Sequence, residues 1–182
     1  MQLVRQGMLD NEHSRCFYFY DYKDSKWILK YQKGINKQDE LYELLVVTRP
    51  SIDYAIIDLN KVYRNTFYAY SPSTIIIIPP IAVWQLFSKL WLVGQELYME
   101  LATTIEEELE VMHGYECNYT FLKNLYQMNN KEMAEAYYEE WQLDVSLTDH
   151  SMQHFIEIIE NFKVEIFNYF IVKQMLDNPL HI

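Results

Sequence analysis

Two groups of glutamate and histidine residues have the spacing at which side chains on one helix face share a metal ion. Glu110 and His113 form a Glu-x-x-His step, which carboxylate-bridged di-iron bundles use. Such a bundle needs a second Glu-x-x-His on another helix, and the sequence contains no other. His113 also precedes Gly114 at an expected helix end, where an imidazolium interacts favourably with the C-terminal dipole. We therefore expect no di-iron centre.

His150 and His154 are four residues apart, and Glu157 follows one turn later. Three such side chains on one helix face could ligate a zinc ion. This segment is the first turn of an expected helix, which is normally exposed to water, and no cysteine or fourth ligand is near it in sequence. Solvated surface histidines are the alternative, and we expect that the protein needs no metal or cofactor.

Common catalytic motifs are absent from the sequence. The four glycines, Gly7, Gly34, Gly94 and Gly114, are too far apart to form a loop that cradles a phosphate. No serine is flanked by glycines in the manner of a nucleophile elbow. These absences argue against nucleotide-dependent and acyl-transfer enzymes, and we expect that the protein is not an enzyme.

The negative charge lies in the second half of the chain. Residues 1–80 contain ten Lys and Arg against nine Asp and Glu, a net charge of +1, whereas residues 81–182 contain five Lys against seventeen Asp and Glu, a net charge of −12. A surface that repels phosphate gains nothing from counterion release, so we expect no direct binding of nucleic acid. The charge favours a basic partner. Acidic helices that only keep the chain in solution are the alternative.

Glutamates on two expected helices form the predicted partner-binding surface. Like charges on one helix repel each other by roughly a few tenths of a kcal/mol per pair, so selection for stability alone would intersperse lysines. Two helices with one carboxylate per turn of about 5.4 Å approach the charge spacing of nucleic acid, about 1.7 Å per phosphate along a duplex. The predicted surface comprises Glu106, Glu107, Glu108, Glu110, Glu132, Glu135, Glu139 and Glu140.

In size, acidic second half and lack of catalytic signatures, the chain resembles small acidic inhibitors of nucleic-acid-handling enzymes, such as phage-encoded anti-CRISPR proteins and nuclease-immunity proteins. The resemblance is one of general character and transfers no residue. It implies an inhibitor that occupies the basic nucleic-acid groove of an enzyme such as a CRISPR effector nuclease. Two other classes stay open: a metal-dependent helical enzyme using His150 and His154, and a homo-oligomeric structural protein whose aromatic strand from Phe17 to Tyr22 forms a subunit interface.

The pair Pro79-Pro80 separates a β-rich half from a helical half. The four isoleucines before the pair are typical of a buried strand, which proline cannot continue. We predict an α+β fold with an N-terminal, mainly antiparallel sheet, one short helix and an acidic C-terminal helical bundle packed on the sheet. The predicted strands are residues 15–22, 27–32, 54–59, 66–70 and 75–78. The predicted helices are residues 37–47, 81–102, one from about Thr103 to Gly114, 119–128, 131–143 and 148–177.

Apolar periodicity predicts which helix faces are buried. Each of three helices has apolar residues at steps of three or four. In the central helix, these are Val83, Leu86, Leu90, Val93, Leu97 and Leu101. In the helix at 131–143, they are Met133, Tyr137 and Trp141. In the last helix, they are Met152, Phe155, Ile159, Phe162, Ile166 and Phe170.

Length and composition favour one domain with two lobes, residues 1–80 and 81–182. Cys16 and Cys117 are a hundred residues apart in sequence, and residues 1–12 have no apolar core like that of a signal peptide, so we expect a cytoplasmic protein. The apolar run at 74–93 contains prolines and polar residues well before it reaches about 18 apolar residues. We therefore expect no membrane association.

If the central helix joins both lobes to one core, the chain should unfold in a single transition. Circular dichroism at 222 nm and tyrosine fluorescence during urea denaturation should then give coincident curves. Two separated transitions would contradict the single-domain prediction.

Overall fold

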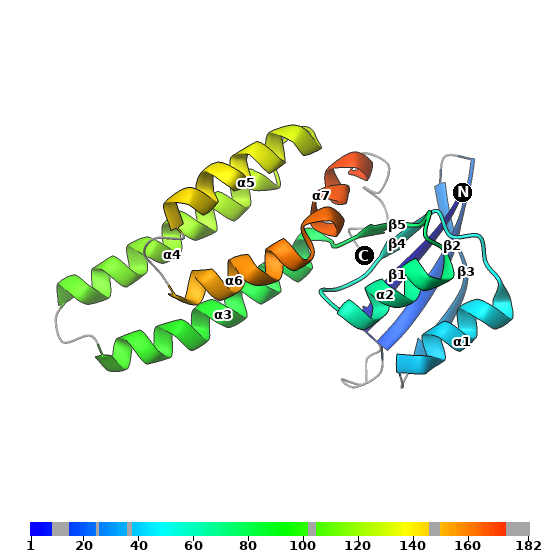
Figure 1. Cartoon of the computed structure of the whole chain (residues 1–182), viewed down its shortest axis with the longest axis horizontal. Coiled ribbons are helices and arrows are strands. Elements are labelled where there is room, and N and C mark those ends of the chain that lie inside the picture. The colour runs from blue at the N-terminus through cyan, green and yellow to red at the C-terminus, as the bar shows by residue number, and fades with distance from the viewer. Residues whose placement is uncertain (9–14, 25, 36–37, 102–104, 146–149, 174–182) are drawn as a thin grey trace. The chain divides into compact units, whose positions relative to one another are not determined.

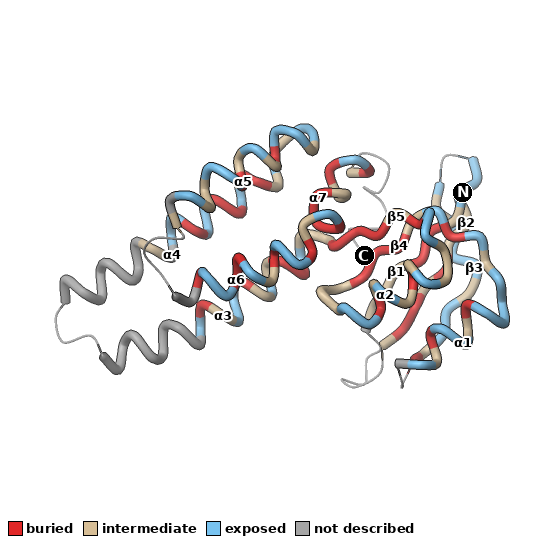
Figure 2. The backbone as a smooth tube through the Cα atoms, viewed as in Figure 1, coloured by how far each residue is buried: buried red, intermediate tan, exposed pale blue. Residues whose placement is uncertain are grey.

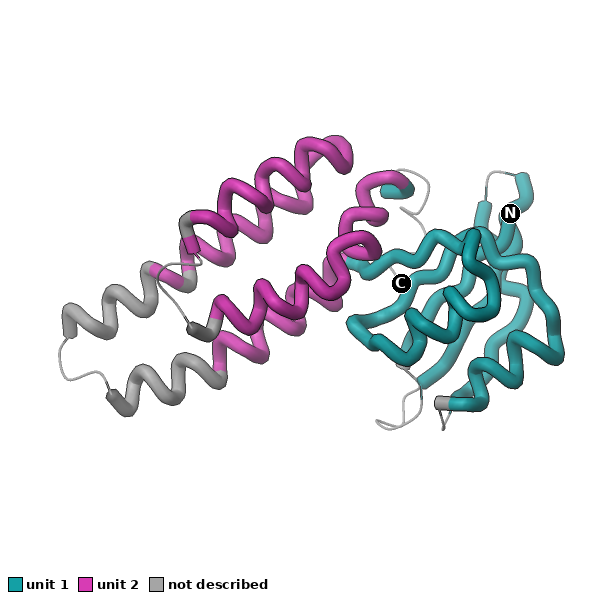
Figure 3. Tube along the Cα trace, viewed as in Figure 1, with its two compact units in different colours: residues 1–79, 172–182 teal, residues 80–171 magenta. Residues whose placement is uncertain are grey.

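The structure is a computed structural model that describes residues 1–8, 15–24, 26–35, 38–101, 105–145 and 150–173. Within these ranges it does not describe the side chains of residues 8, 38, 93–101, 105–113, 115, 144, 150 and 151. Unit 1 consists of Met1–Pro79 with Val172–Ile182, and unit 2 of Pro80–Ile171 (Figure 3). The boundary lies at the proline pair that separates the two predicted lobes. That the two lobes unfold together stays a prediction.

Unit 1 contains a five-stranded mixed sheet with the order β3-β2-β1-β4-β5. The antiparallel strands are β1 (Gln2–Met8), β2 (Arg15–Lys23) and β3 (Lys26–Ile35), whereas β4 (Tyr54–Ile56) and β5 (Ile75–Ile77) run parallel to β1. Helices α1 (Gln38–Thr48) and α2 (Lys61–Tyr70) lie side by side along the sheet (Figure 1). The α+β class is confirmed, although the sheet is mixed and unit 1 has two helices.

Aromatic residues of β2 alternate between buried and half-buried positions, whereas a register shift opposite Phe19 and Tyr20 interrupts the alternation of β3. Phe17 and Phe19 are buried, whereas Tyr18 and Tyr20 are half-buried. Phe17 packs edge-on against Tyr63 of α2, with 5.2 Å between ring centroids. The side chains of Phe17 and Phe19 therefore belong to the core of unit 1 and do not offer a subunit interface, and homo-oligomerisation through other residues stays a prediction.

Residues 66–70 are helical, so the strand predicted there is wrong. Asn60 begins α2, because its Oδ1 accepts hydrogen bonds from the backbone N–H groups of Val62, at 2.9 Å, and Tyr63, at 3.2 Å. Tyr63 and Phe67 are one turn apart and both buried. A strong N-cap and one buried helical stripe outweigh the β propensity of the aromatic residues.

The central strand β1 was not predicted from the sequence. Its segment Gln2–Met8 has only two adjacent branched apolar residues, Leu3 and Val4, and both are buried. Strands β2 and β4 pair with its two edges. Tertiary pairing therefore makes a strand of a segment whose local pattern is too short to indicate one.

Unit 2 is helical, with α3 (Pro80–Leu101), α4 (Ile105–Leu125), α5 (Lys131–Val145), α6 (His150–Asn161) and α7 (Lys163–Val172). Helix α4 runs through Gly114, so the predicted helix end there, and the separate helix at 119–128, are wrong. A Cβ atom at Gly114 would meet no atom within 4 Å. An interior glycine costs a helix only about 1 kcal/mol relative to alanine, which packing of the rest of the helix can offset.

The predicted buried row of the last helix is confirmed, but the helix is not continuous. All six predicted residues are buried, while the chain interrupts its helix at Phe162 and continues as α7 (Figure 2). The backbone N–H of Phe162 bonds to the carbonyl of Ile159 at 3.0 Å, a shorter step than that of an α-helix. A buried row with helical spacing thus persists through a local change of helix type.

In α3 and α5 the buried stripe differs from the prediction. In α3, Val83, Phe87 and Trp91 are buried, whereas Leu86 and Leu90 are only half-buried. The side chains of the other three predicted residues of α3 lie outside the described part of the chain. In α5, the buried residues are Ala134 and Tyr138, one position after the predicted Met133 and Tyr137, and Met133 is 49% exposed.

We expect the Asn60 cap to stabilise unit 1 measurably. Asn60→Ala removes the acceptor for two helix N–H groups and should lower the free energy of unfolding by about 1 kcal/mol in urea denaturation. The control is Asn65→Ala, at an exposed position inside the same helix, where alanine is the better helix former. Equal losses in the two variants would show that the cap contributes nothing of its own.

Candidate partner-binding surface

The predicted acidic surface is described in part. Glu106, Glu107, Glu108 and Glu110 belong to the backbone of α4, but their side chains lie outside the described residues. On α5, Glu132, Glu139 and Glu140 are exposed and Glu135 is half-buried. Asn130 caps α5, since its Oδ1 accepts the N–H of Met133 at 2.9 Å.

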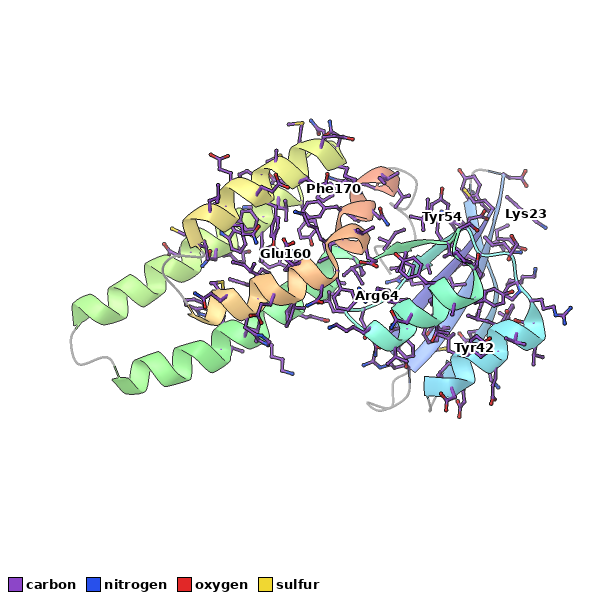
Figure 4. The ribbon with its side chains drawn as sticks, in the orientation of Figure 1. Lys23, Tyr42, Tyr54, Arg64, Glu160 and Phe170 are labelled. Atoms are coloured by element: carbon purple, nitrogen blue, oxygen red, sulfur yellow. The ribbon has the colours of Figure 1, made fainter. Side chains whose placement is uncertain are left out.

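Two lysines neutralise part of the charge of α5. Lys131 lies 3.7 Å from Glu135, one turn further along the helix. Lys163 of α7 lies 3.3 Å from Glu139 and 3.9 Å from Glu160 of α6, which Figure 4 labels. In the part of the chain that the structure describes, Glu132 and Glu140 form no ion pair. Among the described side chains of α5, these two carboxylates thus carry the negative charge that lysines leave uncompensated.

A groove lies between α4 and α5, and Glu140 is on its wall. Its volume is about 520 Å³. The lining residues are Glu116, Cys117, Thr120, Phe121, Tyr137, Glu140 and Trp141. Glu116, on α4, forms no ion pair with any residue of the described ranges. Each helix therefore contributes one uncompensated carboxylate to the same groove.

Stacked rings form the apolar part of the groove. The ring of Phe121 on α4 stacks on Trp141 of α5, with 4.1 Å between centroids and 8° between planes. The ring of Tyr137 stacks on Phe121 at 5.2 Å and 19°. These contacts join the two helices and hold the rings in fixed positions next to the two carboxylates.

Hydrogen bonds fix the indole further. Trp141 Nε1 donates to Asn118 Oδ1 at 3.0 Å, and Asn118 is buried. The hydrogen bond offsets the cost of removing the buried amide from water, and it orients the indole ring. The aromatic part of the groove is thus preorganised. Its lining of carboxylates and aromatic rings suits a cationic group.

Glu116 was not predicted as part of the site. The sequence places it just after Gly114, where a helix was expected to end, so it was not grouped with Glu140. The i, i+4 spacing of Cys117 and Phe121 and of Tyr137 and Trp141 is the signal that would have revealed the facing stripes of α4 and α5.

Most side chains of the two candidate metal sites lie outside the described part of the chain. His154 Nδ1 lies 3.4 Å from Glu157 Oε2, and both side chains are mostly exposed. The side chains of Glu110, His113 and His150 are not described. Among the side chains that are, no group of three His, Cys, Asp or Glu could hold a metal ion.

A second polar cluster, in unit 1, was also missed. Asp58 follows β4, and its Oδ2 accepts a hydrogen bond from Gln6 Nε2 at 2.9 Å and pairs with Arg15. The guanidinium of Arg15 lies 5.5 Å from the ring centre of Tyr63. Carboxyl ends of parallel strands often bind ligands, but here the aspartate is compensated by residues of β1 and β2. The cluster therefore connects strands. In the sequence, the feature that would reveal it is an aspartate directly after a buried strand.

Comparisons with known proteins give no family assignment: no family model matches the chain, and neither a curated protein nor a solved structure matches it. No helix within the described ranges has the length and apolar character needed to cross a membrane.

Tyr138, next to the groove residues, gives a pH-dependent test of this packing. Burial raises the pKa of its hydroxyl, and the Glu160 carboxylate raises that pKa further. A tyrosine whose folded pKa exceeds the unfolded value of about 10 contributes stability that is complete below pH 10 and is lost as the pH rises above it. Tyr138→Phe should therefore lose less stability than the wild type between pH 9 and 10.5.

Urea denaturation at pH 7, 9 and 10.5 measures this difference. Tyr119→Phe, at an exposed position of α4, is the matched control and should follow the wild-type profile. If Tyr138→Phe also follows that profile, the hydroxyl of Tyr138 does not experience the low-dielectric surroundings described above.

Proposed function

We propose that the protein is an inhibitor that binds a basic nucleic-acid-binding enzyme, such as a CRISPR effector nuclease, through the acidic surface of unit 2. The observation that carries the proposal is the charge of that unit. Residues 80–171 contain four Lys against sixteen Asp and Glu, a net charge of −12, whereas residues 1–79 have a net charge of +1. A uniform demand for solubility would not concentrate the charge in one unit.

The distribution of ion pairs supports a surface made for a partner. Lys131 and Lys163 satisfy Glu135, Glu139 and Glu160. Further carboxylates, including those of Glu132 and Glu140, stay uncompensated and repel one another. A basic partner would turn this repulsion into attraction and would associate faster because of long-range steering.

Competition with nucleic acid follows from the charge pattern. Carboxylates on rigid helices offer a basic groove the same sign of charge as phosphates, at a coarser spacing. A protein that presents them would occupy a nucleic-acid groove without being cleaved or unwound. The proposed mechanism is therefore steric and electrostatic, and it uses no catalytic residue of this chain.

Charge reversal tests the proposal once affinity capture from a lysate of the native host has identified the partner. The variant Glu132→Lys, Glu135→Lys and Glu139→Lys should associate with the partner about tenfold more slowly at low salt, and the difference should shrink at high salt. A second variant, Glu106→Lys, Glu107→Lys and Glu110→Lys, tests the predicted glutamates whose side chains are not described. DNA or RNA should compete with the wild-type protein for the partner.

The matched control makes the same change in net charge elsewhere. Reversing Asp39, Glu40 and Glu43 on α1 of unit 1 to Lys should leave association nearly unchanged, apart from the smaller effect of total charge. Circular dichroism confirms that all variants are folded. If both unit 2 variants bind like the wild type at low salt, or if nucleic acid does not compete, the inhibitor proposal fails.

A further inference from the structure

We propose that the groove between α4 and α5 receives an arginine side chain of the basic partner. This inference rests on the proposed function, because it names the group by which the partner is recognised. Three features of the groove lead to it: its two carboxylates, its stacked rings and its free space.

The carboxylates stand on two different helices. Glu116 is exposed on α4, Glu140 is exposed on α5, and both line one groove of about 520 Å³. Within the described residues neither is neutralised, since Lys131 and Lys163 form their ion pairs with other glutamates. A cation that enters between the helices therefore meets negative charge from both walls.

The aromatic rings of the groove favour arginine over lysine. A guanidinium is planar, so it can lie on the face of Tyr137 or Trp141 while its N–H groups point outward to carboxylates. An ammonium group is compact and strongly hydrated, and it cannot form such a stack. A groove that combines aromatic faces with carboxylates thus matches a planar guanidinium better than an ammonium group.

The groove is also rigid, which favours affinity. The stack of Phe121 on Trp141 and the hydrogen bond from Trp141 to buried Asn118 hold its aromatic part in place. Binding would then order the incoming side chain and little of the receptor.

The position of the cysteines allows a direct assay. Cys117 lines the groove and is exposed, whereas Cys16 is buried in unit 1. Alkylation of the folded protein by iodoacetamide, followed by mass spectrometry, therefore reports access to the groove through one thiol. The probes are the capped peptides Gly-Arg-Gly and Gly-Lys-Gly, at equal ionic strength.

We expect Gly-Arg-Gly to slow alkylation of Cys117 several-fold at saturation, and Gly-Lys-Gly to slow it far less. The double variant Glu116→Gln and Glu140→Gln should lose this protection, and Tyr137→Leu should reduce the preference for arginine. Glu132→Gln, on α5 but not on the groove wall, is the control and should keep the wild-type protection. Equal protection by both peptides, or full protection in the double variant, would overturn the inference.

Measurements of partner binding distinguish a failure of this inference from a failure of the proposed function. Glu116→Gln with Glu140→Gln should raise the dissociation rate of the captured partner at least tenfold. If that variant binds normally while the reversal of Glu132, Glu135 and Glu139 still slows association, the arginine site is wrong and the inhibitor proposal stands. If the peptides protect Cys117 as expected and no variant affects the partner, the groove binds free arginine peptides only, and both the inference and the proposed function are wrong.

Discussion

The stacking of Phe121 between Tyr137 and Trp141 is the interaction on which the arrangement of the candidate surface depends. It holds α4 against α5 and sets the rotation of both helices about their axes. Since Glu116 is five residues before Phe121, and Glu140 directly precedes Trp141, the same rotation brings one carboxylate of each helix to the groove. Packing in the apolar interior thus decides where the charge lies.

The charge of the candidate surface depends on this packing and on which glutamates the lysines of unit 2 contact. Lys163 is close to Glu139 and Glu160 and 5.4 Å from the ring centre of Tyr138, so its positive charge is used between helices α5, α6 and α7. Lys131 pairs along its own helix. The carboxylates of the groove receive no such partner within the described residues, so no lysine of those residues reduces their negative charge.

The sequence predicts the α+β class, the division at the proline pair and the buried row from Met152 to Phe170, because each depends on local periodicity or on proline. Prediction from the sequence fails where tertiary contacts determine the secondary structure. The weakly patterned β1 becomes the central strand through its two neighbours, and the aromatic segment of α2 is a helix whose Tyr63 and Phe67 pack against Phe17 of β2. Of the two carboxylates in the groove, the sequence predicts only Glu140 as a partner-binding residue, because Gly114 suggests a helix end just before Glu116.

The central claim is that uncompensated carboxylates of unit 2 contact the partner. Carbodiimide-catalysed labelling of carboxylates, read residue by residue with mass spectrometry, tests it in a single comparison of the free protein with its complex. The account predicts that Glu116, Glu132 and Glu140 become protected, while exposed acids of unit 1 such as Asp39 and Glu43 are labelled equally in both samples. Protection confined to unit 1, with Glu116 and Glu140 labelled as in the free protein, would contradict it.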